Sequence, residues 1–586
     1  MAESVPPSGS RKPNPGFQPQ IRNIATRVLI ILSFGVAVGL IGSFSAVAFV
    51  EVIQWINDKV ISTGDAGSRG FHPFIFIAPV IAGLIVGALL LVSNQPKPLS
   101  LTYLVYAVQS RRNKLSARVG IFHTLAAIIG MGGGASVGIY GPLSTLGATI
   151  GGHLGQLSRA DLTLGIGCGV AAAISTAFNA PIAAILFVHE VILRHYSLRA
   201  FAPITVASST GFFISNYLLE RPALFRVFAE RSFFAPEFLA FVLIGVAGAL
   251  VATLFMQSIL IGDRIAARIG LPDWTKPAIA GLGVGLTAQW IPEVFGVGTQ
   301  LVTATIAGEA GTPGTILIIL LAKILVTALC LGFGFVGGVF SPALIIGVLS
   351  GALMGQLCLL LFGEQSSGLA VYAICGMMAV TSPVIGAPLT AILIVFELTR
   401  NYELTTAVMI SVAFSNVVAY RMCGRSLFDR QLSLQGFDLS QGRDKVILER
   451  TTIAEHVTTD AVLIQSEQPL IDALHAMIEA DRTECYVLDD LTRYQGKLRL
   501  FDIVRLQKRI DIEQQTAGTY ADPEQLRFSN DMSVWEALEL MREFVGESIP
   551  IIDQRGYFIG IIYESTLVAA YLDTLKNLRA EENAAS

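Results

Sequence analysis

Two short motifs of the sequence could bind an anion without using a formal charge. Residues 138–142 read GIYGP and residues 338–342 read GVFSP, and each follows a glycine-rich run and precedes an apolar helical stretch. Proline is favourable near a helix start, where its missing N–H is not needed. A helix start offers unpaired N–H groups and a partial positive charge, and glycine lets an ion approach the backbone. Two such starts pointing at one place would form an anion site.

Both motifs lie in neutral surroundings. No Lys or Arg lies between Arg118 and Arg159, or between Lys323 and Arg400. A buried cation would hold an anion strongly, whereas backbone dipoles let it leave, as transport requires. The alternative is that the glycines serve close helix packing alone.

The two motifs belong to two related halves of the chain. An offset of 200 residues, which places 338 on 138, aligns Gly132 with Gly332, Gly134 with Gly334, Pro142 with Pro342, Gly147 with Gly347, Gly151 with Gly351, Gly155 with Gly355 and Gln156 with Gln356. NAPIAAILFVHE at 179–190 also matches GAPLTAILIVFE at 386–397, at a different offset. Repeated membrane halves are characteristic of channels and transporters with a site at their interface.

Composition places most of the chain in lipid. The 586 residues are 53% hydrophobic and only 14% charged, whereas a soluble globular protein carries about 25% charged residues. Acids and bases are absent from the stretches 28–50, 74–92, 238–255, 324–339 and 407–418. Some reach the roughly 20 residues of a spanning helix. The shorter ones predict tilted, broken or re-entrant segments covered by protein or an aqueous cavity.

Composition changes near residue 430, so we predict a membrane part and a soluble tail. The expected divisions are a disordered cytoplasmic tail at 1–25, a transmembrane domain at 26–430 with repeats at roughly 26–220 and 235–430, and a linker at 431–450. Two similar units at 451–510 and 520–575 and a final tail at 576–586 follow. The sequence pattern of each unit predicts the order helix, strand, strand, helix.

Several function classes are excluded by the residues. The net charge of −4 predicts no nucleic-acid surface. The six cysteines show no metal spacing and are expected to be structural thiols. His189 beside Glu190 lacks further ligands at metal spacing. No nucleophile–base motif or phosphate-binding loop is evident, so we do not expect an enzyme.

These motifs resemble those of the CLC family of chloride channels and proton-coupled chloride exchangers. GIYGP stands where that family usually has G-K/R-E-G-P, and GVFSP matches its GxFxP. The segments FNAPIAAILF at 178–187, NYELTTAVMI at 401–410 and GRSLF at 424–428 also fit. The tail resembles a tandem pair of CBS domains. The resemblance implies an α-helical multi-pass membrane protein with inverted repeats and broken helices, a small α/β CBS pair, and a homodimer with one anion pathway per subunit.

Two departures from the family pattern concern proton coupling. The gating glutamate of the exchangers is replaced by Tyr140, whose ordinary pKa of about 10 does not suit a proton carrier. By spacing, the internal proton-transfer glutamate falls at Val191, and Glu190 lies one residue earlier. A proton relay needs titratable groups in the membrane. We therefore expect passive conduction of chloride or a similar anion. The alternatives are an exchanger with an unusual coupling route or another anion, and a non-transporting sensor.

The expected anion ligands are mostly backbone groups. The family's ligating serine falls at Leu99, with Ser100 as a possible substitute, and its ligating tyrosine falls at Phe428. Tyr140 is interpreted as a gate or hydroxyl donor, the alternative being an aromatic plug that only packs. The candidate anion and gate residues are Gly138, Ile139, Tyr140, Gly141, Val339, Phe340, Ser100 and Phe428.

The tail resembles a CBS pair, and the resemblance implies possible binding of an adenine nucleotide, which such pairs often hold through an aspartate. The first unit keeps that aspartate as Asp502 but has Arg499 in place of a hydroxyl residue, and the second unit has no aspartate. The alternative to nucleotide binding is a platform that stabilises a dimer. No other cofactor and no metal is expected.

Basic residues in the first 27 positions favour a cytoplasmic N-terminus, because cytoplasmic segments carry an excess of Lys and Arg. We expect a plasma or inner membrane location, with the CBS tail also cytoplasmic.

Overall fold

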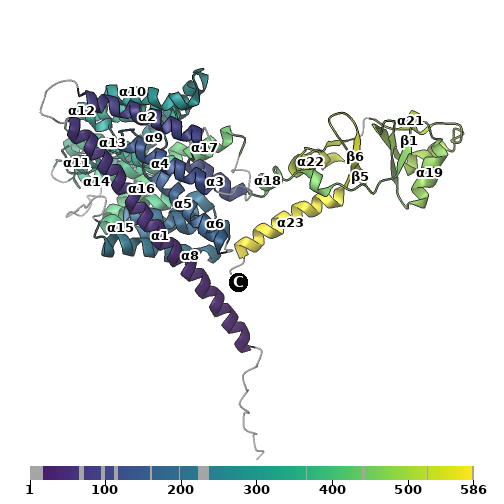
Figure 1. Cartoon of the computed structure of the whole chain (residues 1–586), viewed down its shortest axis with the longest axis horizontal. Helices are drawn as coiled ribbons and strands as arrows, with labels where there is room; N and C mark the ends of the chain where they lie inside the picture. The colour runs from purple at the N-terminus through teal and green to yellow at the C-terminus, as the bar shows by residue number, and fades with distance from the viewer. Residues whose placement is uncertain are drawn as a thin grey trace, which may run out of the picture. The chain divides into compact units, whose positions relative to one another are not determined.

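The computed structural model describes residues 17–64, 72–93, 99–110, 116–158, 161–196, 198–221, 237–309, 311–363, 366–437, 443–523 and 526–583. The chain forms two compact units, Met1–Gly436 and Phe437–Ser586 (Figure 1). Each unit is described by itself.

The first unit is helical throughout the part that the structure describes. Its first half contains α1 (Phe17–Gly64), α2 (Pro73–Val92), α3 (Leu101–Ser110), α4 (Ala117–Gly132), α5 (Tyr140–Leu157), α6 (Leu162–Phe178), α7 (Pro181–Phe187), the π-helical η1 (Val188–Leu193), α8 (Leu198–Phe213) and the π-helical η2 (Ile214–Leu218). Its second half contains α9 (Glu237–Arg268), η3 (Asp273–Thr275), α10 (Lys276–Ala288), η4 (Pro292–Val294), α11 (Thr299–Ile306), α12 (Pro313–Gly332), α13 (Phe340–Phe362), α14 (Leu369–Ile385), α15 (Pro388–Thr399), α16 (Tyr402–Cys423) and α17 (Leu427–Leu434).

Six helical segments of the described residues are long and apolar enough to span a membrane, and five further apolar segments of 10–17 residues, 117–132, 162–178, 181–193, 369–385 and 388–399, are shorter than a span. The apolar stretch 324–339 is broken, as expected for one of the shorter stretches, because α12 ends at Gly332 and a loop leads from there to α13. Glycine-rich apolar loops and helices have the same composition, so hydropathy alone cannot separate them. Helix α1 begins at Phe17, so residues 17–25 are helical rather than disordered. Residues 1–16 lie outside the described residues.

The glycines shared by the two halves pack helices together. Helix α5 packs on α6, and α13 packs on α14. A Cβ atom at Gly147 would lie 2.3 Å from the Gly169 carbonyl oxygen, and one at Gly347 would lie 2.6 Å from that of Met377. Both distances are far below van der Waals contact, so each repeat needs glycine to bring its two helices this close. These glycines therefore serve close helix packing. This does not conflict with the interpretation of the two motifs as an anion site, because the motifs are separate residues.

The second unit contains two three-stranded sheets of identical topology. The first has β1 (Leu463–Gln465), β2 (Glu484–Leu488) and β3 (Tyr494–Arg499), and the second has β4 (Phe528–Ser529), β5 (Ser548–Ile552) and β6 (Phe558–Tyr563). In each, the first strand pairs parallel with the second, and the second pairs antiparallel with the third. The helices are α18 (Arg443–Leu448), η7 (Ile453–His456), α19 (Leu470–Glu479), α20 (Leu500–Leu506), α21 (Ala517–Tyr520), α22 (Val534–Leu540), η8 (Met541–Glu543) and α23 (Glu564–Asn583).

Each sheet packs its helices around a separate apolar core. Ala473, Leu474 and Met477 of α19 belong to the first core, and Ala537 of α22 and the following Met541 belong to the second. The internal repeat of the tail is therefore a repeat of structure. Helix α23 continues through residues 576–583, most of the stretch expected to be a terminal tail.

Candidate anion site between the two repeats

The two motifs meet in the middle of the first unit. Gly138 and Gly338 form an antiparallel bridge in which each N–H donates to the other's carbonyl oxygen, at 2.7 Å in both directions. The Ile139 N–H donates to Ser341 Oγ at 3.3 Å. These reciprocal contacts are what an approximate two-fold axis between the halves produces. Because α5 begins at Tyr140 and α13 at Phe340, two helix starts lie side by side.

The backbones of the two motifs approach each other so closely that this junction requires glycine. A Cβ atom at Gly141 would lie 2.7 Å from the Gly338 Cα, and one at Gly138 would lie 2.8 Å from the Gly338 carbonyl oxygen. The first N–H groups of a helix have no intrahelical partner. The junction therefore brings the partial positive ends of two helices together, with backbone against backbone at the glycines.

A cavity of about 450 Å³ opens beside this junction. Four of the sequence-predicted site residues line it, namely Ser100, Gly141, Val339 and Phe428. The other four do not line it. Gly138, Ile139, Tyr140 and Phe340 are all buried at or next to the bridge. The cavity thus joins α3, α5, α13 and α17, elements far apart in the sequence.

Polar residues that the sequence reasoning missed also line this cavity. Gln431 of α17 accepts a hydrogen bond from Thr102 Oγ1 of α3 at 2.6 Å, which ties the two walls together. Lys276 and Asp273 form an ion pair at 2.6 Å, and Asp263 lies nearby in the lining. No motif marks these side chains, because the fold alone brings α9 and α10 to α17.

Tyr140 occupies an aromatic cluster at the junction. Its ring stacks on Phe178, with centroids 4.0 Å apart and planes 19° apart, and meets the edge of Phe340 at 5.2 Å. Phe187 lies 6.1 Å from the Phe340 ring. None of the described residues hydrogen-bonds to the Tyr140 hydroxyl. The ring therefore fills this position by packing.

Two buried basic side chains occupy matching positions in the halves. Lys323 of α12 donates to the carbonyl oxygens of Val294 at 3.1 Å and Gly296 at 3.2 Å. His123 of α4 lies 200 positions earlier and accepts from the Leu99 N–H at Nδ1, at 2.9 Å. The sequence repeat did not reveal this pair, because the two residue types differ.

Comparisons with known proteins bear on this arrangement. The family described as "Voltage gated chloride channel" matches residues 103–420, which is more than half of the chain, and the CBS domain family matches residues 523–573. The chain belongs to the CLC family.

Curated relatives of this CLC protein carry different transport names. It is 28% identical over 422 residues to "Putative chloride channel protein ClcB-like" of Ralstonia nicotianae, covering 69% of this chain and 96% of the relative. It is 26% identical over 441 residues to "H(+)/Cl(-) exchange transporter ClcA" of Yersinia pseudotuberculosis, covering 72% and 92%. The chain is thus an anion transport protein and not a member of a catalytic enzyme family.

Solved structures share the fold. A slow cyanobacterial Cl⁻/H⁺ antiporter superposes with a TM-score of 0.63 at 21% identity, covering 69% of this chain and 98% of that one. A eukaryotic CLC transporter superposes with a TM-score of 0.60 at 19% identity, covering 92% and 98%. The expected multi-pass CLC fold with a CBS region is confirmed.

The repeated NAP and GAP segments each end in a glutamate that binds the start of a helix in the other half of the CLC unit. Glu190 of η1 accepts from the N–H groups of Leu389 at 3.0 Å and Thr390 at 2.8 Å, at the start of α15. Glu397 of α15 accepts from Ile182 and Ala183 N–H, both at 2.8 Å, at the start of α7. Each carboxylate therefore caps the other half's helix. The neighbouring Val191 is buried and apolar.

Glu397→Ala is expected to destabilise the protein by about 1–2 kcal/mol, since it removes the side chain that satisfies two N–H groups at a helix start. Thermal unfolding of the detergent-solubilised protein would show this as a lower midpoint. Glu309→Ala is the matched control, because Glu309 is exposed and its side chain caps no described helix. Equal midpoints for both variants would contradict the capping role.

The expected nucleotide position lies in the second unit. Asp502 is exposed on α20. Arg499, at the residue before α20, donates from Nη2 to the Val545 carbonyl oxygen of the second CBS repeat at 3.1 Å. The side chain that replaces the usual hydroxyl thus links the two repeats. Nucleotide binding at Asp502 stays a prediction.

Proposed function

We propose that this CLC protein conducts chloride or a similar small anion passively, without coupling to proton movement. The observation that carries the proposal is the aromatic cluster around Tyr140 between the two helix starts. A carboxylate at this place could compete with the anion and take up a proton, whereas a phenol, with an ordinary pKa of about 10, can block the pathway or donate a hydrogen bond but does not carry protons.

The position of Glu190 also supports passive conduction. Its carboxylate accepts hydrogen bonds from Leu389 N–H, Thr390 N–H and, at 2.6 Å, Thr390 Oγ1. Protonation would weaken this cap of α15, so the residue nearest to the expected internal proton station has a structural task. Val191, at the expected station itself, cannot titrate.

The proposed pathway leads through the cavity to the junction. Ser100 and the backbone around Gly141 and Val339 line the cavity and offer neutral donors to an anion. Phe428 contributes an apolar wall without the hydroxyl group of the family tyrosine. Weak neutral donors allow the ion to leave again. We take the Tyr140 ring to be the barrier that must shift during passage.

As the family resemblance implies, we further propose a homodimer with one pathway per subunit in a plasma or inner membrane. The N-terminus and the CBS tail would then face the cytoplasm. Cross-linking of the purified protein in vesicles and protease access to the tail would test these two points.

Tyr140→Ala should raise anion flux in proteoliposomes by about tenfold, because removal of the ring lowers the barrier by about 1.4 kcal/mol. Tyr140→Phe keeps the ring and should leave the rate near that of the wild type while changing selectivity among halides. Chloride efflux and internal pH are recorded together. Tyr402→Ala and Tyr402→Phe are matched controls at an exposed tyrosine. Unchanged rate and selectivity in both Tyr140 variants would remove any gating role.

A second candidate function is proton-coupled exchange by a different route, and His123 is the observation that favours it. This imidazole is buried against Leu99, the residue before Ser100 of the cavity lining, and its Nε2 has no hydrogen-bond partner among the described residues. Proton movement in step with chloride in the wild type, lost in His123→Gln, would replace passive conduction by this alternative.

A further inference from the structure

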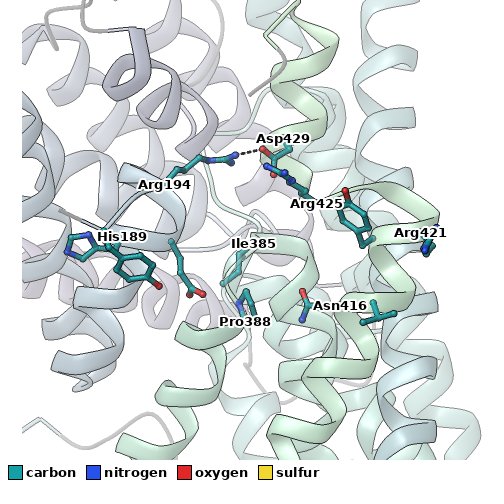
Figure 2. A pocket seen from close by; sticks show the side chains of 13 residues that line it. His189, Arg194, Ile385, Pro388, Asn416, Arg421, Arg425 and Asp429 are labelled. Atoms are coloured by element: carbon teal, nitrogen blue, oxygen red, sulfur yellow. Dashed lines mark hydrogen bonds and ion pairs between the residues drawn. The ribbon is translucent and has the colours of Figure 1, made fainter. Parts of the chain in front are cut away.

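A second cavity of about 670 Å³ lies in the first unit, next to the C-terminal end of α16 (Figure 2). Its lining comes from η1 and the residues after it, the turn between α14 and α15, α16 and α17. It shares no lining residue with the anion cavity. Helix α17 borders both, with Phe428 in the lining of the anion cavity and Asp429 in this one.

The acidic groups of this cavity are already satisfied. Asp429 pairs with the Arg194 guanidinium, as the dashed line in Figure 2 shows. The Glu190 carboxylate accepts three hydrogen bonds from Leu389 and Thr390. Asp429 is thus paired with an arginine, and the oxygens of Glu190 already accept hydrogen bonds from neutral groups.

The basic groups are in excess. Arg421 and Arg425 also line the cavity, and neither guanidinium group forms a hydrogen bond or ion pair with any described residue. Arg194 has a second donor, Nε, which is buried without a partner in the described part of the chain. Buried polar atoms are almost always satisfied, so an orphan donor indicates a missing ligand or water. Figure 2 shows Arg421 apart from the Arg194–Asp429 pair.

The cavity adjoins the last turn of α16 and has exposed tyrosines in its lining. Helix α16 belongs to a candidate membrane span, and Arg421 lies in its last turn. Tyr196, Val417 and Tyr420 line the same cavity and are exposed. Tyrosine is enriched where a membrane meets water, and basic side chains at that level attract anionic lipids.

We propose that this cavity binds a phosphate group, carried by an anionic lipid headgroup or by a soluble phosphate compound. Arg425 and the free Nε of Arg194 are the direct ligands, and Arg421 attracts the anion from the opposite side. Guanidinium groups match the oxygens of phosphate in geometry and charge. The cavity shares no lining residue with the anion cavity, which separates this site from the proposed transport pathway.

Binding to the full-length protein in phosphatidylcholine nanodiscs would test the proposal. One arm adds phosphatidic acid to the bilayer and measures retained lipid by native mass spectrometry. The other adds inorganic phosphate to neutral nanodiscs and measures binding by calorimetry. The variants are Arg425→Gln and Arg421→Gln, with Arg268→Gln as the matched control. Arg268 is an exposed arginine in the last turn of α9 and lines neither cavity.

We expect saturable binding that Arg425→Gln weakens at least about tenfold, or about 1.4 kcal/mol, while Arg268→Gln leaves it unchanged. Retention of phosphatidic acid assigns the phosphate to lipid, and saturation by inorganic phosphate alone assigns it to a soluble compound. No saturable binding in either arm, or equal losses in Arg425→Gln and Arg268→Gln, would overturn the proposal. Unchanged thermal midpoints would show that the variants are folded.

Discussion

Gly338→Ala should reduce anion flux at least about tenfold per folded molecule. A Cβ atom at this position would lie 2.7 Å from the Gly141 nitrogen and 2.9 Å from its Cα. Both are backbone atoms, which cannot rotate away as a side chain does. Overpacking of this kind costs about 1–3 kcal/mol. Relief requires the two helix starts to separate, which would break the 2.7 Å bridge between Gly138 and Gly338.

Flux of chloride from proteoliposomes, normalised to reconstituted protein, measures the effect. Gly270→Ala is the matched control, because a Cβ atom there would meet nothing within 4 Å. We expect Gly141→Ala to behave like Gly338→Ala, since the two residues face each other across the junction. A Gly338→Ala protein with the wild-type rate would show that the junction tolerates separation, and the anion site would then have to lie elsewhere.

The sequence was sufficient to predict that the two motifs meet, because the halves repeat glycines and prolines in register and a repeated motif implies a shared interface. It also placed Ser100 and Phe428 near the site through family resemblance. The cavity beside the junction confirms their proximity to Gly141 and Val339. Their role as anion ligands stays a proposal.

Other features could not be predicted, for identifiable physical reasons. Glu190 and Glu397 were aligned as acidic repeat ends, but a linear pattern does not show that each caps a helix of the other half. Lys323 and His123 occupy equivalent positions of the two halves but are different residue types. A comparison of identical residues between the halves therefore does not detect the pair. Arg194 and Asp429 are 235 positions apart, and they meet because both η1 and α17 pack against α3.

In the CBS unit, Lys497→Met should destabilise the folded state by about 3–5 kcal/mol. Lys497 and Glu484 are both buried, and Lys497 Nζ lies 2.6 Å from Glu484 Oε2. Lys497 also donates to the Ser548 carbonyl oxygen at 2.7 Å, and Glu484 accepts from the Ser548 N–H at 3.1 Å. The ion pair on β2 and β3 therefore holds the start of β5, which belongs to the other sheet.

The expected loss arises from the carboxylate left behind rather than from the missing lysine. Burial lowers the pKa of Lys497, and the ion pair with Glu484 opposes that shift. Without Lys497, Glu484 would be a buried charge with only hydrogen bonds from Ser548 and the Glu547 N–H to stabilise it. The double variant Lys497→Met with Glu484→Gln removes both charges and keeps an acceptor for Ser548. It should therefore be more stable than Lys497→Met alone.

Amide hydrogen exchange of the full-length protein, followed in β2, β3 and β5, measures these free energies of opening locally. Lys445→Met is the matched control, because its ion pair with Glu449 is at 3.5 Å and partly exposed, and such pairs contribute about 0–1 kcal/mol. Equal protection in Lys497→Met and Lys445→Met would mean that the pair does not hold the sheets together. A double variant no more stable than Lys497→Met would show that the ammonium group itself, rather than relief of the buried carboxylate, joins the two CBS repeats.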